Sequence, residues 1–160
     1  MPRRALPLAA LILTAALSLA PAAVARDGHS HESGHGGQLT LDHGRKWQTD
    51  APLRQGMSAI GADMAGALDR IHGNRFGPAD YEALAGSIDA HIDGITRDCR
   101  LPPAADAQLH LVLAEIMDAS EVMKGKGGTR DRSRGAVTVV KALDAYQAHF
   151  DHPGWRPLAH

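Results

Sequence analysis

Apolar residues recur at steps of three and four positions in four separate segments of this chain, and no other feature constrains its fold as strongly. That spacing places the apolar side chains on one face of an α-helix. The two-residue alternation that is typical of a half-buried strand does not occur in the sequence. Helices that each have one apolar face can bury those faces against one another. The sequence therefore predicts an all-α fold, an antiparallel four-helix bundle.

Prolines, glycines and capping residues predict where these helices begin and end. Thr49 or Asp50 can cap the first helix, and the Pro102-Pro103 pair stops the second helix before the third begins. The expected helices cover about 50–73, 78–97, 104–123 and 133–150. The apolar stripes predict a core made of Leu53, Met57, Ile60, Met64, Leu68, Ile71, Tyr81, Leu84, Ile88, Ile92, Ile95, Leu109, Val112 or Leu113, Ile116, Ser120, Met123, Val137, Val140, Leu143, Tyr146 and Phe150.

The first 25 residues have the three parts of a secretory signal peptide. Arg3 and Arg4 give a positive start, an apolar stretch follows, and Ala23-Val24-Ala25 is a small-residue cleavage site. The apolar stretch is shorter than the roughly 20 residues that span a bilayer, so we expect cleavage and export to the periplasm rather than a membrane anchor. The expected organisation is a signal peptide over 1–25, a disordered His- and Gly-rich arm over 26–48, a helical bundle over 49–152 and a C-terminal tail over 153–160.

Charge and motifs narrow the class of function. The formal net charge is −1 at pH 7 and becomes more negative when Arg3 and Arg4 are removed, so no nucleic-acid partner is predicted. No later segment is long and apolar enough to suggest a membrane span, so no membrane association is expected after cleavage. G-x-S-x-G does not occur, and the one match to H-E-x-x-H, at His31 to His35, lies in the Gly- and His-rich arm rather than on a predicted helix. The sequence therefore favours a non-enzymatic protein. The single cysteine, Cys99, can be a buried thiol, a metal ligand or half of an intermolecular bridge.

A histidine-rich run follows the predicted cleavage site. It reads DGHSHESGHGG over residues 27–37 and contains His29, His31 and His35, with His43 further along. Neutral imidazole is a good ligand for Cu(II), Zn(II) and Ni(II). A disordered chain loses conformational entropy when it binds, so the predicted metal site is weak and exchangeable. The alternative is that the run is a soluble linker, because His-rich composition alone does not prove metal binding.

A second set of metal-ligating residues falls on the predicted helices. His91 and Cys99 lie about two turns apart toward the end of the second helix, and His110 lies in the third helix across the short link. These three side chains could meet at one end of a helical hairpin. With the sulfur of Met57 or Met117 they would form a soft site suited to copper. The alternative is that His91 is a hydrogen-bonded structural residue.

Two short motifs resemble a known family. Met57 lies early in the first predicted helix, and ALDAYQAHF closes the fourth. In these features the segment from about Asp50 to Phe150 resembles the superfamily of cytochrome c-prime and the soluble periplasmic b-type cytochromes. The resemblance implies a four-helix bundle, and a haem with Met57 and His149 as its axial ligands. Helix-face homodimers, which such relatives form, are a further implication.

The sequence departs from that family at its haem motifs. No C-x-x-C-H occurs, so covalent haem attachment by that route is excluded. Gln147 stands where the b-type histidine is expected, and His149 follows two residues later, about 200° around the helix. The alternative is that Met57 fills the core and His149 lies at the surface.

Three hypotheses for function follow from the sequence. The first is an exported, non-enzymatic helical protein that binds a transition metal, copper before zinc or nickel, for buffering, delivery or sensing. The second is a haem-binding electron carrier of the cytochrome type. The third is a structural or interaction protein whose arm is only a tether. A metal ion is the expected partner, and a periplasmic protein is a further candidate.

Overall fold

The computed structural model describes residues 37–127 and 132–159. These residues are mostly helical, as predicted. The predicted signal peptide over 1–25 lies outside the described residues, and so do His29, His31 and His35. None of the helices within the described ranges is long and apolar enough to cross a membrane.

The described residues form helices at the four places that the sequence predicts. The helices are α1 (Ala51–His72), α2 (Pro78–Asp98), α3 (Pro103–Met123) and α4 (Arg132–His149). Each observed boundary falls within about two residues of the expected one, because the caps and prolines act locally. Two short strands, β1 (Trp47–Gln48) and β2 (Phe150–Asp151), were not predicted.

Asp50 joins the start of α1 to the link between α2 and α3. One carboxylate oxygen accepts a hydrogen bond of 2.9 Å from the backbone N–H of Leu53, which is the N-cap bond of α1. The other oxygen accepts a bond of 2.6 Å from the backbone N–H of Arg100. Burial raises the pKa of Asp50, but the bonds from Arg100 and Leu53 outweigh it and lower the pKa below its usual value.

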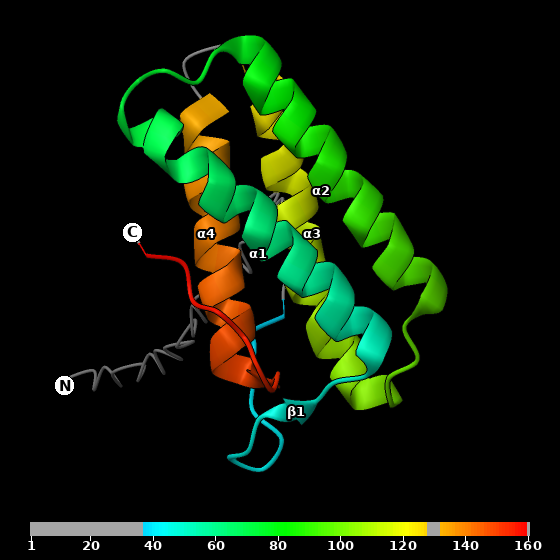
Figure 1. The fold of residues 1–160 in the computed structure, drawn as a ribbon. Helices are drawn as coiled ribbons and strands as arrows, with labels where there is room; N and C mark the ends of the chain where they lie inside the picture. Colours follow the sequence, from blue (N-terminus) through cyan, green and yellow to red (C-terminus); the bar gives the residue numbers. More distant parts are fainter. Residues whose placement is uncertain (1–36, 128–131, 160) are drawn as a thin grey trace, which may run out of the picture. The chain divides into compact units, whose positions relative to one another are not determined.

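The helices pack most extensively as the pairs α1 with α2 and α3 with α4, and α2 also packs against α3 (Figure 1). Glycines allow close approach in both pairs. A Cβ on Gly56 would overlap the Ile95 side chain of α2. A Cβ on Gly135 would lie 2.6 Å from the carbonyl oxygen of Ala119 in α3. Glycine is therefore required at these two positions for the helices to pack as they do.

The core contains nearly all of the predicted apolar positions, including the buried hydroxyl of Ser120. Val137 is a wrong prediction, because its side chain is 51% exposed. The face of α4 that packs inward instead uses Gly135, Ala136 and Val139. Steps of three and four fit more than one face of a helix, and the small residues that define this face carry little apolar signal.

Residues 37–48 differ from the predicted disordered arm, because they pack on the helices. The indole Nε1 of Trp47 donates a hydrogen bond of 2.6 Å to the carbonyl of Thr40, whose N–H donates one of 2.7 Å to Gln108 in α3. Trp47 also pairs with Phe150 in a parallel β1–β2 ladder. Leu39 and Trp47 pack against the core. Leu39 and Trp47 thus hold an otherwise polar segment against the helices, and a prediction of disorder from average composition does not detect two such residues.

Candidate functional site

His43 is the histidine of the predicted arm that the structure describes. Its side chain is 93% exposed and lies 3.9 Å from the Asp42 carboxylate. His43 and Gly44 have φ of 48° and 81° and form the centre of a turn closed by paired backbone bonds between Asp42 and Arg45. Positive φ at both central residues is the geometry of a type I′ turn, which Gly and His tolerate better than most residues. The turn presents the His43 imidazole to solvent.

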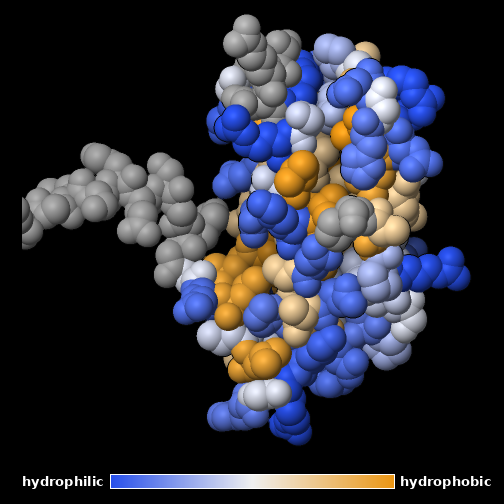
Figure 2. Space-filling view, turned by 90° about the vertical axis from the view of Figure 1, so that its left-hand side faces the viewer, coloured by the Kyte–Doolittle hydropathy of each residue, from blue (hydrophilic) through white to orange (hydrophobic). Residues whose placement is uncertain are grey.

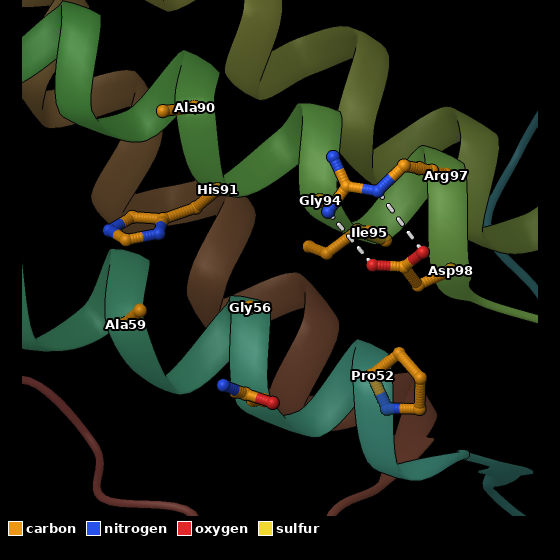
Figure 3. A pocket seen from close by; sticks show the side chains of 10 residues that line it. Pro52, Gly56, Ala59, Ala90, His91, Gly94, Ile95, Arg97 and Asp98 are labelled. Carbon is orange, nitrogen blue, oxygen red and sulfur yellow. Dashed lines mark hydrogen bonds and ion pairs between the residues drawn. The ribbon is translucent and has the colours of Figure 1, made fainter.

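His91 and His110 have different hydrogen-bond partners. His91 projects from α2 toward α1 (Figure 3), and its Nε2 lies 3.2 Å from a carboxylate oxygen of Asp63. The same oxygen accepts a bond of 2.6 Å from the hydroxyl of Ser87. Nδ1 of His110 donates a bond of 2.9 Å to the carbonyl of Asp106. Within the described ranges, no group of three or more His, Cys, Asp or Glu side chains is arranged to hold a metal.

Cys99 is half-buried at the end of α2, beside Asp50. Burial and the negative charge of Asp50 raise the pKa of the thiol to about 12. Cys99 is therefore a protonated thiol at neutral pH, whereas the form that ligates metals and attacks electrophiles is the thiolate. The structure favours the interpretation of Cys99 as a buried thiol.

Met57 and His149, the residues implied as haem ligands, occupy different environments. Met57 is fully buried in the core. Nδ1 of His149 donates a bond of 2.7 Å to the carbonyl of Ala145, which leaves Nε2 as the unprotonated nitrogen of a neutral ring. Gln147 connects α4 to the C-terminal segment, because its side-chain oxygen accepts a hydrogen bond of 3.2 Å from the indole N–H of Trp155. Neither Met57 nor His149 lines either of the two grooves described next.

A groove of about 240 Å³ runs between α1 and α2 (Figure 3). Pro52, Gly56 and Ala59 line one side, and His91 with Ile95 lines the other. Arg97 and Asp98 lie at one end and pair with each other at 2.9 Å. Gly56 contributes no side chain to this groove, and the two charged residues at its end are already paired with each other.

An aromatic cluster at the end of α4 was missed by the sequence reasoning. The rings of Tyr146 and Phe150 stack at 5.1 Å, and His152 and Trp155 meet the Tyr146 ring edge-on at 5.8 and 5.2 Å. Nδ1 of His152 lies 2.9 Å from the Tyr146 hydroxyl, and its Nε2 lies 3.2 Å from Oγ of Ser58 in α1. Burial, and to a lesser extent the charge of Arg54, lower the pKa of His152.

A tight turn brings this cluster together. The backbone N–H of Trp155 donates a bond of 3.1 Å to the carbonyl of His152, and Gly154 between them has φ of 83°. Proline followed by a glycine with positive φ is the signature of a type II turn. The Pro153-Gly154 pair in the sequence is the signal that could have predicted this reversal, and with it a packed C-terminal segment.

A second groove, of about 670 Å³, lies between α1 and this C-terminal segment. Gly61, Ala62 and Ala65 line it from α1, and Trp155, Arg156, Pro157, Leu158 and Ala159 from the other side, with Ser58 at its edge. In Figure 1 the C-terminal segment lies at the left, and the face seen from that side carries hydrophobic patches among hydrophilic residues (Figure 2).

Comparison of the chain with protein-family models, with curated proteins and with solved structures finds no match. The resemblance to the cytochrome superfamily therefore stays a prediction.

Proposed function

We propose that this chain is an exported, non-enzymatic protein that binds a transition metal through the histidines of its N-terminal arm, with copper preferred over zinc and nickel. The ligands are His29, His31, His35 and His43. The metal is exchangeable, and the role is buffering, delivery or sensing. The four helices act as the folded carrier, and an antiparallel bundle is the arrangement that their short links support.

The observation that carries the proposal is the position of His43 in an exposed turn within an anchored segment. Its imidazole is almost fully exposed and stands beside the Asp42 carboxylate, a second ligand type for divalent metals. Thr40 and Trp47, on either side of this turn, are held to the rest of the fold by hydrogen bonds and by the β1–β2 ladder. The histidine-rich run is continuous in sequence with this segment, so few residues separate His35 from His43.

Copper titration of designed variants tests the proposal. The variant that removes residues 27–36 is expected to lose Cu(II) uptake, and His43→Gln is expected to bind more weakly. His72→Gln is the matched control, because His72 is also an exposed histidine but lies at the end of α1. The deletion stops at residue 36 because residues 37–48 pack on the helices. Uptake by the deletion variant equal to that of the parent protein would contradict the proposal.

Elemental analysis of the untagged protein, purified from a metal-replete periplasm, separates this function from the alternatives. Copper, zinc or nickel near stoichiometry supports metal handling and names the ion. Iron with a strong near-ultraviolet band favours the cytochrome-like carrier and directs attention to Met57 and His149. A protein that holds no metal and takes up none in the titration favours an interaction module.

A further inference from the structure

The hydrogen bonds around His152 have one favourable direction. The Tyr146 side chain is fully buried, and its hydroxyl lies 2.9 Å from Nδ1 of His152. A buried O–H group without an acceptor costs free energy, whereas an unused lone pair on the same oxygen costs less. The Tyr146 hydroxyl therefore donates to Nδ1. A neutral imidazole then carries its proton on Nε2, which donates to Oγ of Ser58 at 3.2 Å.

This direction determines what Ser58 offers to the groove between α1 and the C-terminal segment. The Ser58 oxygen accepts the bond from His152, so its own proton remains free to be donated elsewhere. Ser58 is exposed and lines the edge of the groove. A chain of hydrogen bonds in one direction strengthens the donor at its end. The groove therefore presents a hydroxyl donor, which selects an acceptor such as a carboxylate oxygen.

The walls of the groove determine the rest of its chemistry. Its volume of about 670 Å³ lies within the range of small-molecule sites. Small residues of α1 form one wall, and Trp155, whose indole N–H donates a hydrogen bond to Gln147, lines the other side. Arg156 is the charged residue among those that line the groove. An apolar body against the indole and one negative charge near Arg156 complement this lining.

We propose that this groove binds a small monocarboxylate with an aromatic or short-alkyl body. The carboxylate accepts a hydrogen bond from the Ser58 hydroxyl and pairs with Arg156. The body packs beside the point where Trp155 meets Gly61, against the indole and the alanines of α1. No residue of the histidine-rich arm is among those that line this groove, so the proposal does not depend on metal binding.

Calorimetric titration of the full chain with benzoate, in the presence of a chelator, tests the site. A Cβ on Gly61 would already lie 3.6 Å from the Trp155 ring, so the longer side chain of Gly61→Leu fills the groove. Gly66→Leu is the matched control, since Gly66 is an exposed glycine of α1 with no atom of another residue within 4 Å of its Cβ position. We expect Gly61→Leu to lose benzoate binding and Gly66→Leu to keep it.

Two surface substitutions test the ligand class and do not depend on the folding of Gly61→Leu. Ser58→Ala is expected to weaken benzoate binding about tenfold, equivalent to about 1.4 kcal/mol. Arg156→Gln is expected to weaken benzoate binding but to leave the binding of benzyl alcohol unchanged. Absence of saturable benzoate binding up to about 10 mM overturns the proposal. It is also overturned if Ser58→Ala and Arg156→Gln both bind benzoate as the parent does, or if benzyl alcohol binds as tightly as benzoate.

Discussion

Helices α3 and α4 approach closely at Gly135, and one added methyl group there is predicted to destabilise the fold. In Gly135→Ala the new Cβ would lie 2.6 Å from the carbonyl oxygen of Ala119 and 3.0 Å from the backbone nitrogen of Met123. Both atoms belong to the backbone of α3, so they cannot rotate away as a side chain can. The substitution must therefore push the two helices apart.

The magnitude follows from two opposing effects. A carbon–oxygen contact is normally about 3.3–3.6 Å, so the helices would have to separate by about 0.7 Å or more. Overpacking of this kind costs about 1–3 kcal/mol, and a clash with backbone places Gly135→Ala near the upper end. Alanine is favoured over glycine in a helix interior by about 1 kcal/mol. The expected net loss in the free energy of unfolding is about 2 kcal/mol.

Gly66→Ala is the matched control, because its Cβ position in α1 has no neighbour within 4 Å. Alanine is a better helix former than glycine and meets no clash at this position, so the free energy of unfolding is expected to rise by about 0.5–1 kcal/mol. Urea unfolding followed by far-ultraviolet circular dichroism should therefore separate the two variants by about 3 kcal/mol at an unchanged m-value. A Gly135→Ala protein that is as stable as the parent would refute the packing argument.

Three further predictions concern the titrating groups of the fold. Asp50→Ala is expected to lower the free energy of unfolding by about 1 kcal/mol at pH 7, because the N-cap bond is lost. Since the folded pKa of Asp50 is lowered, this difference from the parent should be present above pH 3.8 and should shrink as the pH falls through the folded pKa. Urea unfolding at a series of pH values measures it. Burial lowers the pKa of His152, so the free energy of unfolding of the parent should decrease as the pH falls below 6.5. In His152→Gln the free energy of unfolding should depend less on pH, and equal pH dependence in the two proteins would argue against a buried neutral imidazole. The thiol of Cys99, with a pKa of about 12, should react with iodoacetamide at pH 8 much more slowly than free cysteine, and faster in Asp50→Ala; a rate equal to that of free cysteine would contradict its burial.

The sequence predicted the helices well because their ends are determined locally. Asp50 caps α1 through a bond to Leu53, three residues away, and Pro103 begins α3 wherever the chain goes next. The error at Val137 has a different cause. The packing face of α4 is determined by the close approach of α3 to Gly135. This approach depends on both helices together, so the sequence of α4 alone does not predict it.

The candidate sites show the same division between local and distant interactions. The turn at His43 and Gly44 depends on neighbouring residues, and a sequence pattern can describe it. By contrast, 94 positions separate Ser58 from His152, and neither residue belongs to a recognisable motif. They meet because Tyr146 anchors the imidazole and the Pro153-Gly154 turn reverses the chain.

The C-terminal segment links fold and site through Trp155. Its indole N–H bonds Gln147, and its ring contacts Tyr146 and borders the groove opposite Gly61. Gln147 occupies the position where the cytochrome resemblance expects a haem ligand, and here that position holds the tail against α4. The hydrogen bond between Gln147 and Trp155 therefore holds one wall of the groove in place on α4.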